Sequence, residues 1–230
     1  MEDRQMNTRI TLTLSAVAVA AALATPSVAL AGLSGNVGVT SNYIWRGKTQ
    51  TDDAAAISGG LDYDFGNGFS VGTWTSNVDF PGGVIAPDKD KGYELDLYGG
   101  YAGKMGSLDY GLGITHYAYP IHDNSDLDFT EFYGNLGFGP ATFGVAYTFN
   151  ADDDDQEGNI YYSLGASTDI KEGLSLGGTV GRYDFDTGNG DYTHYQVNLS
   201  KGDFTFAVDD NNTSDSDPVV SVSWAHALDL

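Results

Sequence analysis

The sequence predicts an all-β protein: a single antiparallel transmembrane β-barrel of about twelve strands, preceded by a cleaved signal peptide. Three observations favour this fold class. Apolar and polar residues alternate along segments of about ten residues, the length of a tilted transmembrane strand. Short and long connections between these segments alternate along the chain. No apolar run after the N-terminus approaches the roughly 20 residues that a membrane-spanning helix needs.

Residues 1–31 have the pattern of a secretory signal peptide. Basic residues precede an apolar stretch from Ile10 to Ala24, and Ala29-Leu30-Ala31 resembles a small-residue cleavage site. We therefore expect cleavage after Ala31, with residues 32–230 forming the barrel. An N-terminal membrane anchor is the alternative, and the short apolar run disfavours it.

The segment from Tyr93 to Tyr119 shows the strand pattern most clearly. Leu95 and Leu97 lie on one parity, and Glu94 and Asp96 lie on the other. A glycine-containing break follows, and the alternation then restarts, which predicts a hairpin. Its apolar parity would face lipid and its polar parity would face a lumen.

Eleven connections in all divide the mature chain into twelve expected strands. The expected strands lie near Ser34–Arg46, Ala54–Phe65, Phe69–Val78, Tyr93–Ala102, Leu108–Tyr119, Asp128–Phe138, Ala141–Asn150, Asn159–Ile170, Leu174–Tyr183, Tyr192–Ser200, Phe204–Asp209 and Val219–Leu230. Tight turns such as Gly139-Pro140 alternate with longer connections that are mostly acidic. Because the count is even, both termini are expected on the periplasmic side.

Aromatic residues near the strand ends are expected to form the two interfacial girdles of a barrel. The residues concerned are Tyr43, Trp45, Tyr63, Phe65, Tyr101, Tyr110, Phe129, Phe138, Phe143, Tyr147 and Phe149.

The composition narrows the list of partners. The net charge of -22 disfavours binding to nucleic acid or to an anionic membrane surface. The absence of cysteine excludes disulfides, thiolate metal sites and thiol nucleophiles. We expect outer-membrane lipid and lipopolysaccharide, small solutes or cations, and the barrel-assembly machinery as partners; the oligomeric state stays open. No cofactor is expected.

The sequence contains no distinctive motif for an enzyme active site or for a metal site. His116 and His226 share the parity of lipid-facing residues, as an outer-membrane lipid hydrolase would require, but no serine sits in a recognisable motif beside them. Interfacial anchoring is the preferred interpretation of both. Two acidic runs, residues 152–157 and 209–217, lack the spacing of an EF-hand loop, so we expect solvated loops instead of a metal site.

The polar parity carries the candidate site residues, which we expect to line the lumen. They are Arg46, Asp62, Asp64, Glu94, Asp96, Asp109, Glu131 and Asp209. An inward arginine among carboxylates is either a salt-bridged plug or part of a transverse field across a pore, and the sequence leaves both open. The parity of Arg182, near a strand end, is ambiguous.

Four short motifs suggest a family. They are Ser41-Asn42-Tyr43 followed by Arg46-Gly47, then Gly72-Thr73-Trp74, then Glu94 to Tyr101, and finally Val219 to Ser223. Together they make the mature chain resemble the TorF family of Gram-negative outer-membrane porins. The resemblance implies a small outer-membrane barrel with a role in diffusion.

Two functions from different classes remain. The first is a porin for passive diffusion of small hydrophilic solutes or ions, with a mild preference for cations. The second is a structural or surface-interaction barrel with a closed lumen and acidic extracellular loops. A lipid hydrolase is a distant third, so we expect the protein not to be an enzyme.

The C-terminal residue generates the first prediction. Family strands of this kind usually finish on an aromatic residue, whereas this chain ends in Leu228-Asp229-Leu230. We expect Leu230→Phe to raise the fraction of folded, heat-modifiable protein in outer membranes, because the assembly machinery would then meet its usual signal. Equal folded fractions for the two forms in heat-modifiability gels would contradict this.

Overall fold

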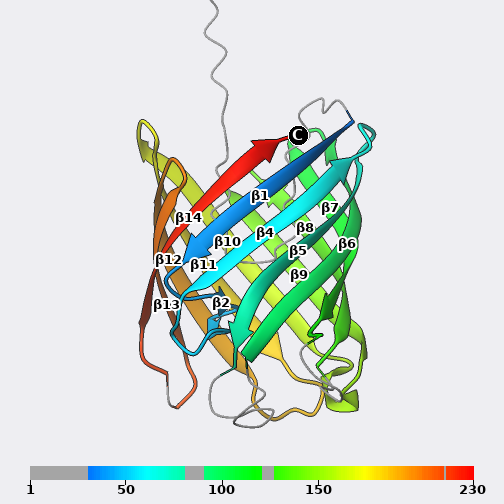
Figure 1. Ribbon diagram of the computed structural model, residues 1–230, viewed down its shortest axis with the longest axis vertical. Helices are drawn as coiled ribbons and strands as arrows, with labels where there is room; N and C mark the ends of the chain where they lie inside the picture. Colours follow the sequence, from blue (N-terminus) through cyan, green and yellow to red (C-terminus); the bar gives the residue numbers. More distant parts are fainter. Residues whose placement is uncertain (1–30, 81–90, 121–126, 215) are drawn as a thin grey trace, which may run out of the picture.

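A closed antiparallel barrel of twelve strands forms the body of the protein (Figure 1). The computed structural model describes residues 31–80, 91–120, 127–214 and 216–230. The barrel strands are β1 (Gly32–Thr40), β4 (Ala56–Asp64), β5 (Phe69–Asp79), β6 (Lys91–Met105), β7 (Leu108–Ala118), β8 (Phe129–Phe138), β9 (Ala141–Ala151), β10 (Ile160–Lys171), β11 (Leu174–Asp184), β12 (Tyr192–Lys201), β13 (Phe204–Asn211) and β14 (Val219–Asp229). The predicted fold class is confirmed.

Strand β1 closes the barrel by pairing on both of its edges. Thr40 lies opposite Ala56 of β4 on one side and opposite Ser223 of β14 on the other. The remaining strands pair with their neighbours in chain order. Closure leaves no strand edge exposed to hydrocarbon, where an unpaired backbone group would cost several kcal/mol.

The alternation of the side chains follows the predicted parity. Leu97 is 52% exposed on the outer face, whereas its neighbour Asp96 is 0% exposed inside the barrel. The exposed side chains on the outer face are mainly leucine, isoleucine, valine and aromatic residues. An apolar exterior and a polar interior are what a bilayer demands of a barrel.

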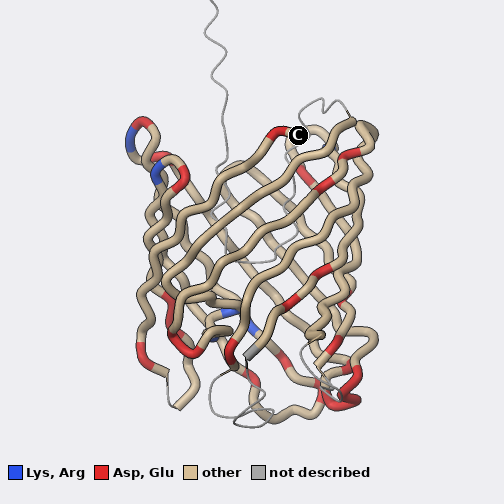
Figure 2. The backbone as a smooth tube through the Cα atoms, in the orientation of Figure 1, with Lys and Arg blue, Asp and Glu red and all other residues tan. Residues whose placement is uncertain are grey.

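The two ends of the barrel differ in their connections (Figure 1). Short turns lie at the end where β1 begins and β14 ends; two of them use Gly139 and Gly202, both with a φ of 57° in the left-handed region. We call this the turn end and the opposite one the loop end. Acidic residues gather mainly at the loop end (Figure 2).

The first strand is shorter than predicted, and this is the main correction to the fold. The predicted strand 34–46 ends at Thr40, and the chain then turns into the barrel. There it forms a small hairpin from β2 (Ile44–Trp45) and β3 (Lys48–Thr49). The alternation of residues 41–46 belongs to this hairpin and not to the wall. The other predicted strands agree with the structure to within a few residues.

Helical structure is limited to one short turn in the described part of the chain. The 3₁₀ turn Asp154–Gln156 lies between β9 and β10. Across residues 31–80, 91–120, 127–214 and 216–230, no helix has the length and apolarity to span a membrane. The predicted signal peptide, residues 1–31, lies outside the described residues apart from Ala31.

Three of the predicted girdle residues lie inside the barrel instead. Tyr43 is 1% exposed and Phe129 is 6% exposed, and Trp45 packs against Phe129. Tyr43 and Trp45 lie inside the barrel because β1 ends before them, at Thr40. Phe129 is the first residue of β8 and has the inward parity. Outward-facing aromatic residues near strand ends, such as Phe65 and Phe138, are exposed as a girdle requires.

The outer face generates a stability prediction. Leu97→Arg should lower the free energy of unfolding by roughly 2 to 4 kcal/mol, because a lipid-facing cation near the bilayer midplane loses its hydration. Urea unfolding of the barrel in lipid vesicles measures this change. The control Leu97→Met keeps the side chain apolar and should stay close to the wild type; equal stabilities of the two variants would contradict the assignment of Leu97 to the lipid face.

Candidate functional site

The hairpin of residues 44–49, here the inner hairpin, is the centre of the candidate site. Arg46 and Gly47 form its two-residue turn, and their φ angles are 49° and 78°. Two successive positive φ angles are the signature of a type I′ turn. Glycine adopts this conformation readily, whereas it is strained for arginine, so tertiary contacts must hold Arg46 there.

The inner hairpin runs from the β1–β4 connection into the lumen, and its tip reaches β12 and β13. At its tip, the Gly47 carbonyl oxygen accepts a hydrogen bond of 2.8 Å from Asn211 Nδ2 of β13. A Cβ atom at Gly47 would lie 2.3 Å from the Cβ of His194 on β12. The tip therefore touches the wall so closely that glycine is required at this position.

Arg46 and Glu131 form a bidentate ion pair across the lumen. Arg46 Nη1 and Nη2 donate to the two Glu131 carboxylate oxygens at 2.8 and 2.6 Å. The side chains are only 8% and 3% exposed. Fork-to-fork pairing fixes both the orientation and the position of the guanidinium group. We call this ion pair the latch.

Aromatic rings surround the Arg46 guanidinium. Its Cζ atom lies 4.1 Å from the centroid of the Trp45 ring and 4.2 Å from that of Tyr161. Tyr183 lies slightly farther away, at 5.3 Å. Cation–π contacts replace part of the hydration that a buried guanidinium loses. The latch thus combines one carboxylate and an aromatic cage.

Glu94 is the second carboxylate of this region, and it is held by two phenols. The hydroxyl groups of Tyr43 and Tyr119 each donate to Glu94 at 2.8 Å. Burial, followed by the nearby Glu94 carboxylate, raises the pKa of Tyr43 well above that of an ordinary phenol. The Tyr43 hydroxyl therefore stays protonated and remains a donor to Glu94.

Asp96 is the third carboxylate, and it differs from the other two. It is 0% exposed, and among the described residues neither of its carboxylate oxygens has a hydrogen-bond partner. Its neighbours Trp74 on β5 and Tyr117 on β7 are its ladder partners. A buried carboxylate without a partner is costly, and so Asp96 is the least satisfied group beside the inner hairpin.

The remaining predicted site residues do not gather at the inner hairpin. Asp62 accepts from the Tyr98 hydroxyl at 2.6 Å, and Asp109 pairs with Lys104 at 3.1 Å, nearer the turn end. Asp209 accepts from Gln196 Nε2 at 2.8 Å. Asp64 accepts from the Gly66 backbone N–H at 2.6 Å in the first short turn.

Arg182, which was ambiguous in the sequence, lies on the outer face. It pairs with Asp184 and with Asp191, and its side chain is 48% exposed. It therefore has no part in the latch.

The environment of the lumen changes from one end to the other. Near the inner hairpin, inward side chains such as Glu131, Thr148 and Thr115 are buried. Toward the turn end, inward side chains such as Asp62, Asn135 and Thr179 are partly exposed. The inner hairpin therefore fills the loop half of the lumen, and the turn half keeps accessible polar walls.

Sequence reasoning missed Tyr161, Tyr183 and His194, which contact the inner hairpin from the far wall. Their inward parity was readable, but nothing local indicates what they contact. One signal could have revealed the hairpin itself. A first strand of residues 34–46 would be longer than the 9 to 11 residues needed to span a bilayer, and Ser41-Asn42 would interrupt it.

His116 and His226, the two histidines considered for a lipid hydrolase, each have a polar neighbour. His116 Nδ1 lies 3.0 Å from Thr130 Oγ1, and His226 Nδ1 lies 2.8 Å from Asp203 Oδ2. In the acidic run of the β9–β10 loop, Asp153 caps the backbone N–H of Asp155. Within the described ranges, no group of three or more histidine and acidic side chains is placed to hold a metal ion.

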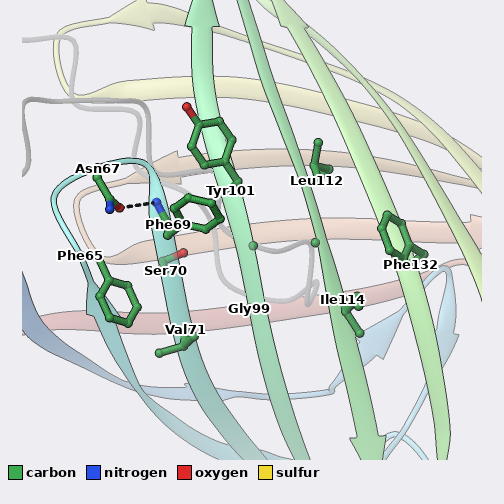
Figure 3. Close-up of a pocket in the computed structure, with 12 residues that line it drawn as sticks. Phe65, Asn67, Phe69, Ser70, Val71, Gly99, Tyr101, Leu112, Ile114 and Phe132 are labelled. Atoms are coloured by element: carbon green, nitrogen blue, oxygen red, sulfur yellow. Dashed lines mark hydrogen bonds between the residues drawn. The ribbon is translucent and has the colours of Figure 1, made fainter.

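A pocket on the outer wall is separate from this site. Its lining includes Phe69, Tyr101, Leu112, Ile114 and Phe132 around Gly99 (Figure 3). Phe69 and Tyr101 pack at 4.8 Å between ring centroids. The apolar side chains face outward, so the pocket is a shallow groove on the lipid-facing surface.

Known proteins resemble this chain mainly in fold. A family model described as "Bacterial protein of unknown function (Gcw_chp)" matches residues 24–219. No curated protein sequence matches the chain.

Two solved structures show the likeness. The KdgM porin has 9% identity and a TM-score of 0.51, with 86% of this chain and 99% of that chain covered. An outer membrane channel from Pseudomonas putida F1 has 10% identity and a TM-score of 0.52, covering 89% of this chain and 97% of that one. The fold is therefore that of porin-like barrels of the Gram-negative outer membrane.

The latch generates a third prediction. Arg46→Gln should lower the free energy of unfolding by about 3 to 5 kcal/mol, because it leaves the Glu131 carboxylate buried without a counter-charge. The double change Arg46→Gln with Glu131→Gln should recover part of this loss, since no charge is then left buried. Urea unfolding of the folded barrel measures both.

Arg182→Gln is the matched control for this cycle. Its exposed ion pairs should contribute less than about 1 kcal/mol. A double variant as unstable as the sum of its two single variants would show that Arg46 and Glu131 are not coupled.

Proposed function

Since the chain belongs to the Gcw_chp family of bacterial proteins of unknown function, no activity comes with the family, and we propose from the geometry that the protein is an outer-membrane porin. It would let small hydrophilic solutes or ions diffuse passively. The likeness to porin-like barrels supports this at the level of the fold.

The observation that carries the proposal is that inward side chains in the turn half are polar and partly exposed. A Cβ atom at Gly72 would lie 2.5 Å from Cε2 of Tyr98, and one at Gly113 would lie 2.3 Å from the Tyr133 hydroxyl. Because these inward positions are glycine, both tyrosines lie against the wall instead of across the lumen. A barrel built only for stability would gain by filling this space with larger side chains.

The charges on the wall support a mild preference for cations. Asp62, Asp64 and Asp209 face the lumen, and the inward Arg46 is neutralised by Glu131. A low-dielectric wall focuses the field of such carboxylates along the pathway. The preference should be weak, because the Debye length of about 8 Å at physiological salt is comparable with the width of a narrow lumen.

A closed-lumen structural barrel is the second candidate, and the inner hairpin favours it. The latch and its aromatic cage fill the loop half with buried side chains. In that case the acidic residues at the loop end would carry a surface interaction, with lipopolysaccharide as a partner. Measured conductance separates the two candidates.

The remaining parts of the proposal concern export, family and chemistry. Export through the signal peptide and folding by the barrel-assembly machinery follow from an outer-membrane location. The resemblance to the TorF family fits the same role. We propose no enzymatic activity, since His116 and His226 pair with Thr130 and Asp203 in positions that suit anchoring.

The fourth prediction tests the porin role. Purified barrel in a planar bilayer should conduct, and its reversal potential across a KCl gradient should indicate mild cation selectivity that declines at higher salt. Asp62→Asn with Asp64→Asn should reduce the selectivity, because both carboxylates lie in the accessible turn half. The control Asp203→Asn changes a turn residue that pairs with His226, and it should leave the selectivity unchanged.

An anion-selective reversal potential would contradict the assigned field, as would one indifferent to the double change. A complete lack of conductance in the wild type would favour the closed-lumen barrel.

A further inference from the structure

The carboxylates beside the inner hairpin are unequally satisfied. Glu131 has Arg46, and Glu94 has two phenolic donors, but Asp96 is fully buried with both oxygens unpartnered among the described residues. In water Asp96 would be hydrated. Its burial next to Glu94 therefore opposes the packed arrangement of the loop half.

The backbone of the hairpin tip adds a second opposing contribution. Arg46 occupies the left-handed region at a φ of 49°, which is strained for a residue with a long side chain. A withdrawn hairpin would release this strain. The packed position is maintained by the latch, the cation–π contacts and the Asn211 hydrogen bond at the tip.

The hairpin is also connected to the wall in a way that permits withdrawal. It leaves β1 at Thr40 and returns to β4 at Ala56, and the return segment at Asp52 and Asp53 is exposed to solvent. Its contacts with β8, β10, β12 and β13 are made by side chains and by one carbonyl, not by a shared sheet. At its base, one backbone hydrogen bond joins it to the wall, from the Asp79 N–H of β5 to the Gln50 carbonyl oxygen at 2.8 Å. Side-chain contacts can break without unfolding the barrel.

We propose that the inner hairpin is a gate, held closed by the Arg46–Glu131 latch and opposed by the buried Asp96 carboxylate. In the open state the hairpin leaves the lumen, Asp96 becomes hydrated, and the loop half joins the polar pathway of the turn half. This inference rests on the proposed porin function and adds its regulation. The latch and Asp96 thus act in opposite directions at the same site.

The test uses three single variants of the full barrel. Glu131→Gln breaks the latch and should raise the open fraction in single-channel recordings by about tenfold, as the loss of roughly 1.4 kcal/mol would. Asp96→Asn replaces the carboxyl group that opposes closure by a neutral amide and should lower the open fraction. Asp203→Asn is the matched control, because this carboxylate lies in an exposed turn and pairs with His226, so its loss should leave the open fraction unchanged.

A second readout follows the hairpin without conductance. The chain has no cysteine, so Ser76→Cys introduces a single thiol. Ser76 is 2% exposed, faces inward beside Val78, which packs with Tyr43, and has Glu94 as its ladder partner. A water-soluble thiol reagent should label it about tenfold faster in the Glu131→Gln background and more slowly in the Asp96→Asn background.

The outcomes separate the gate from the porin role. If Asp96→Asn shifts only the reversal potential, or raises the open fraction and the labelling rate as Glu131→Gln does, the gate is wrong while the porin stands. If nothing conducts but labelling responds in opposite directions, the porin role fails and the hairpin motion stands. Labelling and open fractions that are equal in all variants would overturn the gate.

Discussion

Every feature of this protein depends on the need to pair backbone groups inside a bilayer. A strand edge cannot be left open in hydrocarbon, so β1 must meet both β4 and β14. Closure then fixes the parity of each strand, because side chains alternate between lipid and lumen. Because the apolar parity of each strand faces lipid, its polar parity faces the lumen.

Carboxylates buried in the polar interior need a counter-charge or hydrogen-bond donors. Around the inner hairpin they are compensated unequally. Arg46 neutralises Glu131 and is itself held by aromatic rings, and Tyr43 and Tyr119 supply donors to Glu94. Asp96 receives nothing comparable from the described residues. Packing of the loop half therefore combines strong specific contacts with one unfavourable burial, which suits an element that has two positions.

Glycine has a different role in the turn half. Inward glycines on β5 and β7 provide the space in which Tyr98 and Tyr133 lie along the wall. The same barrel thus leaves inward side chains partly exposed in one half and buries them in the other. This contrast, and not the family name, is the basis for assigning a diffusion pathway with a restriction at the loop end.

The sequence by itself determined the barrel, its strand count and the inward parity of Glu94, Asp96 and Glu131. Strand alternation has a period of two residues and is readable in any short segment, since a bilayer imposes it on every strand. The sequence could not place Arg46, which it assigned to the end of a strand that stops at Thr40. The latch joins residues that are 85 positions apart, and the rings around Arg46 come from β10 and β11. Only the tertiary structure decided this arrangement, because which wall an inserted hairpin reaches depends on the curvature of the closed barrel and on no local pattern.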